Sequence, residues 1–319
     1  MPSQQRTTHK GELMKFRPLG LLINVLCFTV LANSACTQTS PTPNDDDQTN
    51  DAIVRGRSVN NKGLAAKSVV ALVSEISQGQ ALCTGTLIDE ATVLTAAHCV
   101  DQDPEKLVVV FGARIKAAAE SNIREATAFA QNPRWRKNGS KANSKANSKG
   151  RGDLALVHFE GGIPSGFTPV TLATKSLSLE EGTSVLMLGY GVSNGLSQSG
   201  AGILRETQTT VVTQASPTEI ITDGRKSSVC FGDSGGPAFI NDGRRLVQWG
   251  VASSVTNENC NEASIHTSVM TYLRWIKTTE NRLNEGSAQQ SDETPETAAA
   301  RPTAHRRHLA ELITDDDDQ

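Results

Sequence analysis

The middle of the chain consists of short apolar runs that are separated by turn residues. From Ile53 to about Ile276 these runs have the length of β-strands and are rich in Val and Thr. They are 68–74, 86–97, 106–112, 153–159, 184–191, 207–213, 237–240 and 246–254. Aromatic residues make up only 4% of the chain and glycines number 26, which also favours strands and turns over helical bundles. We therefore predict an all-β protein.

One segment near the end of this region has helical periodicity. Within residues 268–284, apolar side chains recur at helical spacing. The pattern predicts one C-terminal helix, which closes a domain of residues 53–285. The tail, residues 286–319, is polar and ends in an aspartate run, and we expect it to be disordered.

The first 36 residues are typical of a secretory signal peptide. Lys15 and Arg17 precede an apolar run from Leu19 to Ala32. That run is shorter than the roughly 20 residues that a membrane-spanning helix needs. Met14 fits as the start of translation better than Met1, because residues 1–13 are polar.

The signal ends in Ala-Asn-Ser-Ala-Cys, and Cys36 resembles the lipidated cysteine of a bacterial lipoprotein. Asn33 departs from that pattern, which usually has Leu there. The alternative is cleavage by an ordinary signal peptidase after Ala32 or Ala35. Residues 37–52 read as a polar linker or propeptide. We expect an exported protein, either secreted or lipid-anchored in the outer membrane or periplasm, with a lipid on Cys36 as its only membrane contact.

Four cysteines remain once Cys27 and Cys36 are set aside: Cys83, Cys99, Cys230 and Cys260. In an exported protein they suggest two disulfides, with three connectivities open. Their spacing does not suggest zinc, and we expect neither a metal nor a cofactor. The net charge of −3 and the pI near 6.1 suggest no nucleic-acid partner.

The sequence Gly-Asp-Ser-Gly-Gly-Pro, residues 232–237, predicts a tight exposed turn around Ser234. A serine nucleophile needs a base, a group that orients the base, and donors for the oxyanion. The amides of Gly232 and Ser234 can point at one spot from such a turn. His98 and Asp153 are the candidate base and orienting group, and each adjoins an apolar run.

Three blocks resemble those of the chymotrypsin-like (trypsin-fold) serine proteases, and they occur in that family's order. The blocks are 83–100, 153–159 and 230–237, and the Gly-Tyr-Gly of 189–191 and the segment 271–276 agree with them. The resemblance covers about residues 53–278. It implies two six-stranded antiparallel β-barrels with a C-terminal helix. It also implies a monomeric serine endopeptidase that cleaves proteins or peptides, here of a bacterial exported type.

The resemblance also implies a role for each site residue. Ser234 attacks the scissile carbonyl, His98 takes its proton and passes it to the leaving amine, and Asp153 orients the imidazole. The amides of Gly232 and Ser234 form the oxyanion hole, and Ser253 hydrogen-bonds Asp153. The implied disulfides are Cys83–Cys99 and Cys230–Cys260.

Two other interpretations compete with this one. The glycines around Ser234 also match the nucleophile elbow of α/β-hydrolases, but that fold needs the order Ser, acid, His. After Ser234 the histidines are His266, His305 and His308, and strand–helix alternation is missing. A catalytically dead family member that binds proteins is the second alternative, although all three triad residues are present.

The residues that match the substrate pocket predict a preference for small or medium apolar side chains before the cut, as in elastases. Ser228 matches the pocket floor and Val229 follows it. Val255 occupies a wall position where glycine normally leaves the pocket open, and Ser264 lies at the other side. The alternative is a preference for Glu through His266. Glutamate-specific relatives also have a histidine where this chain has Ala252.

The segment from Arg134 to Arg151 carries seven Lys or Arg residues and no acid, which predicts an exposed loop. In the simplest interpretation the lysines belong to a solvated loop that does not act on the substrate. The alternative is a loop over the cleft that favours acidic substrates. The adjoining Arg-Gly-Asp sequence is not expected to act in adhesion, because Asp153 is needed elsewhere.

Residues 52–59 match the family's mature start, where a cut frees the amine of Ile53. In relatives that amine inserts beside the aspartate that precedes the nucleophile, here Asp233, and orders the oxyanion hole. Ala52 precedes the cut, and the expected pocket accepts Ala. We therefore expect maturation by the enzyme itself or by one of similar specificity.

Overall fold

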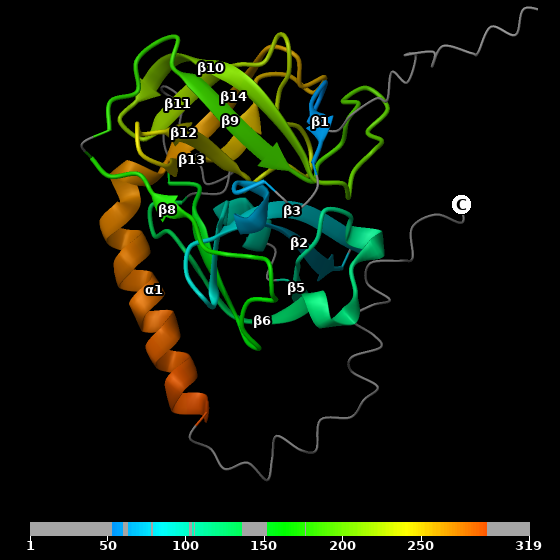
Figure 1. The fold of residues 1–319 in the computed structure, drawn as a ribbon, viewed down its shortest axis with the longest axis vertical. Helices are drawn as coiled ribbons and strands as arrows, with labels where there is room; N and C mark the ends of the chain where they lie inside the picture. The colour runs from blue at the N-terminus through cyan, green and yellow to red at the C-terminus, as the bar shows by residue number, and fades with distance from the viewer. Residues whose placement is uncertain are drawn as a thin grey trace, which may run out of the picture. The chain divides into compact units, whose positions relative to one another are not determined.

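The computed structural model describes residues 53–59, 63–77, 79–101, 104, 106–135, 152–175 and 177–291, and Figure 1 shows their fold. These residues belong to one compact unit. The signal peptide, Cys36, the linker with Ala52, most of the lysine-rich segment and residues 292–319 lie outside the described residues. Expectations about them therefore stay predictions. Within the described residues, no helix combines the length and apolar character needed to cross a membrane.

Six antiparallel strands close the first barrel in the order β2-β3-β4-β7-β6-β5. They are β2 Val69–Ile76, β3 Gly79–Leu87, β4 Thr92–Thr95, β5 Lys106–Val110, β6 Ile123–Gln131 and β7 Ala155–Phe159. Strand β2 is buried on both faces. Val70 and Leu72 lie in the barrel's own core. Val69 and Ala71 lie in a second cluster that includes Leu188 of the other barrel. The pleat of β2 thus joins the two barrels.

The second barrel is a ring of six further strands in the order β9-β10-β11-β14-β13-β12, closed by pairing of β12 with β9. They are β9 Ser184–Gly189, β10 Arg205–Ser216, β11 Glu219–Asp223, β12 Pro237–Asn241, β13 Leu246–Val255 and β14 Ala263–Ser268. Two short strands extend this sheet: β1 Arg57–Ser58 pairs with β10, and β8 Thr171–Leu172 runs parallel to β13. The expected pair of six-stranded barrels is confirmed.

Short 3-10 turns connect several strands. They are η1 Ala66–Ser68, η2 Ala97–Val100, η3 Ile115–Ala117 and η4 Glu120–Asn122. Turn η2 follows β4 directly and carries His98, so a strand of the first barrel delivers this side chain to the barrel's edge.

The single α-helix of the described residues is α1, Val269–Ser291. Ser268 precedes it, and its hydroxyl accepts a hydrogen bond from the Thr271 N–H at 3.4 Å, as an N-cap does. One side of α1 packs on a cluster that contains both barrels' residues, including Leu94, Leu156 and Val251. The helix residues in this cluster are Val269, Tyr272, Leu273, Trp275, Ile276 and Leu283.

Several elements differ from the sequence-based expectation. The apolar run 86–97 is two strands, because Asp89 accepts the Ala91 N–H at 2.7 Å and turns the chain between them. Strand β7 begins at Ala155, two residues after Asp153. Helix α1 continues to Ser291, beyond the expected domain end at residue 285. The residues between Leu283 and Ser291 include no proline, and the single Gly286 weakens a helix without ending it.

Removal of the Ile276 side chain tests how far α1 stabilises the fold. Ile276 is fully buried among residues of both barrels. We expect Ile276→Ala to lower the free energy of unfolding by about 2–5 kcal/mol, measured by urea denaturation. Asn281→Ala, at an exposed position of the same helix, is the matched control and should change it little. Equal losses in both variants would contradict this role of the helix.

Candidate functional site

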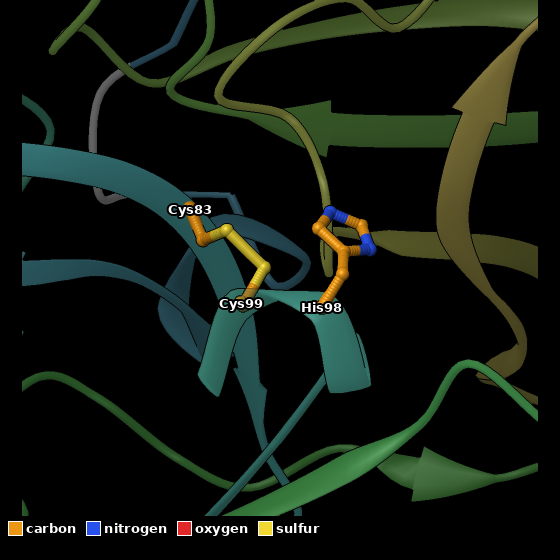
Figure 2. Close-up of side chains that lie close together, drawn as sticks. All are labelled: Cys83, His98 and Cys99. Carbon is orange, nitrogen blue, oxygen red and sulfur yellow. A yellow bond between two sulfur atoms is a disulfide. The ribbon is translucent and has the colours of Figure 1, made fainter. Parts of the chain in front are cut away.

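His98 is held at the barrel edge by a disulfide to the neighbouring strand. Cys99 of η2 is bonded to Cys83 of β3, and Figure 2 shows the imidazole projecting from the same turn, away from the sulfurs. Cys83, His98 and Cys99 have ligand atoms within 4.8 Å of one another. Both sulfurs are consumed by the disulfide and lack the thiolate form that binds metals, so the cluster does not read as a metal site.

The Asp153 carboxylate receives hydrogen bonds from both barrels. One oxygen accepts the His98 backbone N–H at 3.0 Å. The other lies 2.8 Å from His98 Nδ1 and accepts the Ser253 hydroxyl at 2.6 Å. Asp153 is 1% exposed, so these partners replace the water that a buried carboxylate loses. The arrangement places the ring proton on Nδ1 and leaves Nε2 to face the cavity.

Gly152 explains why the chain can bring Asp153 to this place. Its φ is +72°, a backbone conformation that side chains with a Cβ rarely adopt. An added Cβ would also lie 3.2 Å from both the Arg134 Cβ and the Tyr272 hydroxyl. The glycine of the Arg-Gly-Asp sequence therefore has a structural reason in the turn before β7.

The surroundings of His98 favour its protonated form. Burial of the ring lowers its pKa, but the hydrogen bond and charge of Asp153, with the charge of Asp101, outweigh this effect and raise the pKa above 6.5. About a third of the side chain is exposed, with a relative accessibility of 33%. The Trp135 ring lies beside it at a centroid distance of 6.4 Å.

The turn that carries Ser234 is anchored to the first barrel. The Thr84 N–H of β3 donates to the Ser234 carbonyl at 2.8 Å, and the Thr84 hydroxyl donates to the Gly232 carbonyl at 2.9 Å. Gly235, at φ +83°, could not carry a Cβ, which would lie 2.0 Å from Thr95 Oγ1. The turn can approach β3 this closely only because the residue is glycine.

Ser234, His98 and Asp153 line one cavity of about 830 Å³. Among the hydrogen bonds of the described residues, none joins Ser234 Oγ to His98 Nε2; such contacts are often looser without substrate. The backbone amides of Gly232 and Ser234 donate no hydrogen bond to any described residue. Both amides are thus free to donate to a bound group.

Asp233 lies behind the serine, fully buried. Its carboxylate accepts the N–H groups of Gly191 and Cys230, each at 2.8 Å. Burial raises the pKa of Asp233 to about 7, against the lowering effect of these hydrogen bonds and of the Arg205 charge. Ile53 is also fully buried, and Val54 forms a β-bridge with Ser228.

The structure divides the predicted pocket residues into two groups. Val229, Ser253 and Val255 line the cavity. Ser228 and Ser264 do not, because both are fully buried and their hydroxyls bond each other at 2.8 Å. Ser228 as the pocket floor therefore stays a prediction, and its buried hydroxyl does not line this cavity. The second disulfide, Cys230–Cys260, lies beside this wall, in the pairing that the resemblance implies.

His266 is likewise closed off from the cavity. It is fully buried, its Nε2 lies 3.0 Å from the Thr222 hydroxyl, and its ring packs against Trp249 at a centroid distance of 5.5 Å. Burial lowers its pKa to about 4, so the ring is neutral near pH 7.

Other residues of the cavity wall were missed in the sequence. They are Asp101, Trp135, Phe231, Ser254, Thr256, Asn257, Glu258 and Ile265. Phe231 and Ile265 are sequence neighbours of the predicted Gly232 and Ser264, which was a usable signal. Trp135 had none, because 17 residues of mostly polar chain separate it from Asp153.

Comparison with known proteins identifies the family. The family model described as Trypsin matches residues 53–276. Serine protease SP24D of Anopheles gambiae is 31% identical over 221 residues, which cover 64% of this chain and 74% of that protein. The chymotrypsin of Phaedon cochleariae is 29% identical over 232 residues, with 65% and 75% covered. Both relatives are insect proteins, and the bacterial exported type stays a prediction.

A solved structure carries the same fold. HL collagenase, solved at 1.7 Å resolution, superposes with a TM-score of 0.58 at 23% identity, covering 72% of this chain and 98% of that chain. The barrels rule out the α/β-hydrolase alternative, which needs a parallel sheet between helices. The family match over most of the chain, on this fold, leads to one conclusion: the chain belongs to the trypsin family and is a serine endopeptidase.

Proposed function

We propose that peptide bonds are hydrolysed by a triad of Ser234, His98 and Asp153. The observation that carries this proposal is the Asp153 carboxylate, which bonds the His98 ring on the wall of the cavity that Ser234 also lines. His98 Nε2 takes the proton of the Ser234 hydroxyl as its oxygen attacks the scissile carbonyl. The protonated ring then gives that proton to the leaving amine, and water releases the acyl group by the same steps.

The unoccupied N–H groups of Gly232 and Ser234 support an oxyanion hole. Gly232 has φ +91°, and a Cβ there would lie 2.8 Å from the Gly191 Cα. A glycine is therefore needed to aim its amide. Donors that are already oriented stabilise the charge that develops on the carbonyl oxygen in the transition state.

Loss of the Ser234 hydroxyl tests the nucleophile. We expect Ser234→Ala to abolish peptide hydrolysis and covalent labelling by a fluorophosphonate, because the attacking oxygen is lost. Ser254→Ala, a second serine of the cavity wall, is the matched control and should keep its labelling. Full labelling of Ser234→Ala would contradict the proposal.

The pH dependence of hydrolysis tests the His98–Asp153 pair. Because Asp153 raises the pKa of His98, we expect kcat/KM to fall with decreasing pH through a value above 6.5, where the base becomes protonated. Asp153→Asn should shift that value downwards and lower kcat by on the order of 10⁴, since the ring loses its orienting acceptor.

Asp101→Asn is the control for the effect of charge alone. It removes a second carboxylate that raises the His98 pKa but makes no hydrogen bond to the ring. We expect the acidic limb of the kcat/KM pH profile to shift slightly to lower pH, with kcat nearly unchanged. An equal loss of kcat in both variants would contradict an orienting role for Asp153.

We propose a preference for small or medium apolar residues before the cut. Val229, Val255 and Ile265 line the cavity, and the hydroxyls of Ser228 and Ser264 are occupied with each other behind the wall. Against these three apolar side chains a basic substrate side chain would lose water without gaining a charged partner. The burial of His266 and its bond to Thr222 favour this proposal over glutamate specificity.

Opening the wall at Val255 tests this specificity. We expect the wild-type enzyme to prefer peptides with Ala or Val before the cut. Val255→Gly should improve kcat/KM for Phe relative to Ala by about tenfold, as expected for a few methylene groups. Val212→Gly, in the exposed part of β10, is the control. A wild-type preference for Arg or Glu would overturn the proposal.

We propose that a cut between Ala52 and Ile53 activates an exported precursor. In the uncut chain Asp233 is buried without a salt-bridge partner among the described residues, and its raised pKa reflects that cost. A free Ile53 amine would supply the opposite charge. The two disulfides fit an exported protein, and a lipid on Cys36 would tether the precursor.

The termini of expressed protein test the activation step. We expect the wild-type enzyme to begin at Ile53 and Ser234→Ala to keep its upstream residues, as N-terminal sequencing would reveal. Asp233→Asn should be cut by added wild-type enzyme yet stay poorly active, because the new amine has no partner. Equal processing of wild type and Ser234→Ala would exclude self-cleavage, and activity with Ile53 still internal would overturn the model.

A further inference from the structure

A second, strongly basic cavity lies away from the catalytic one. It has a volume of about 700 Å³, and its lining comes from α1, from the chain at the end of β6 and from Lys175. Its cations and aromatic residues come from three separate segments: Arg134, Lys175, Tyr272, Arg274, Trp275 and Arg282. We call this cavity the basic hollow. Arg274 and Arg282 are eight residues apart and so share one face of α1.

Acids do not line the basic hollow among the described residues, although the charge of Glu219 acts on its Tyr272. No described carboxylate forms an ion pair with its four cations. Arg134 interacts with the Tyr272 hydroxyl, a neutral group. Three other described cations do pair with acids: Arg57 with Glu206, Arg225 with Asp223, and Lys277 with Glu280 at 2.7 Å on the same helix.

A concave site with four cations and two aromatic rings suits an extended anionic segment. The hollow's own chain continues from α1 into such a segment. Residues 292–319 contain eight acidic and three basic residues, and four of the acids are consecutive, Asp315–Asp318. These four match the four cations of the hollow in number.

The connecting chain is long enough to reach. Ser291 lies about 26 Å along the helix axis from Arg274 and about 14 Å from Arg282, at 1.5 Å per residue. Residues 292–314 span up to about 75 Å when extended. The aspartate run can therefore fold back along α1. Its tether would give it an effective concentration in the millimolar range, which an untethered partner rarely reaches.

We propose that the segment Asp315–Asp318 of the same chain binds the basic hollow. The aspartates pair with Arg134, Lys175, Arg274 and Arg282, and the tail lies back along α1. Arg134 precedes Trp135, whose ring stands beside His98, so the docked tail would restrain the chain that forms one wall of the catalytic cavity. The proposal does not depend on the catalytic triad.

Cross-linking of the full-length chain tests the contact directly. A carbodiimide joins a carboxylate to an amine only where they touch. We expect mass spectrometry to find Asp315–Asp318 joined to Lys175 far more often than to Lys226, an exposed lysine outside the hollow. Such cross-links should disappear in Arg274→Gln/Arg282→Gln. Equal cross-linking to both lysines would overturn the proposal.

Competition by a labelled peptide of residues 309–319 tests the occupant. Fluorescence anisotropy should show weak binding to the wild-type chain, whose own tail fills the hollow. Substitution of all four aspartates by Asn should tighten binding by at least about tenfold, because the tethered competitor is lost. Adding Arg274→Gln/Arg282→Gln to that variant should weaken peptide binding again by about tenfold. Added salt should weaken the binding in the same way, because it screens the charges.

Arg244→Gln/Arg245→Gln is the matched control, because it removes the same charge from an exposed hairpin outside the hollow. It should leave peptide binding unchanged, and an equal effect would reduce the interaction to net charge and overturn the site. A sulphated polysaccharide should bind the Asp→Asn variant more tightly than the wild type. Equal affinity for both would assign the hollow to an external polyanion and would overturn the tail as its occupant.

Discussion

The buried Asp153 carboxylate makes the contacts on which the candidate site depends. It takes two hydrogen bonds from His98 in the first barrel and one from Ser253 in the second. A buried carboxylate without such partners would cost several kcal/mol or take up a proton. The hydrogen bonds that stabilise the buried Asp153 carboxylate therefore also orient the His98 ring and hold β13 close to Asp153. One set of contacts both stabilises the buried charge and fixes the geometry of the site.

Much of this site could be predicted because its residues lie in local motifs. The glycines around Ser234, the cysteine beside His98 and the apolar run after Asp153 each leave a mark on the sequence. The sequence pattern of strands β6, β11 and β14 is weaker. Their sequences, such as Glu219–Asp223, alternate with polar residues or are short, so that pairing with neighbours rather than their own composition makes them strands.

The substrate pocket could not be predicted as well, because position in a motif does not determine exposure. Ser228 and Ser264 are 36 residues apart, and only the folded β-sheet shows that their hydroxyls satisfy each other. His266 and Thr222 form the same kind of pair across 44 residues. Polar side chains that looked available for substrate are instead used to close the interior behind an apolar wall.

Thr84 shows how the serine depends on the barrel that does not contain it. Its backbone and hydroxyl hold the turn of Ser234, and its hydroxyl also accepts the Tyr190 N–H at 3.1 Å. A chain in which only one barrel has folded therefore has either His98 without the ordered turn of Ser234, or that turn without its anchor. While the chain is being synthesised, when neighbouring chains are still unfolded and easily cut, such an intermediate would be harmless to them. If the proposed triad is the catalytic one, its division between two barrels makes completed folding a condition for proteolysis.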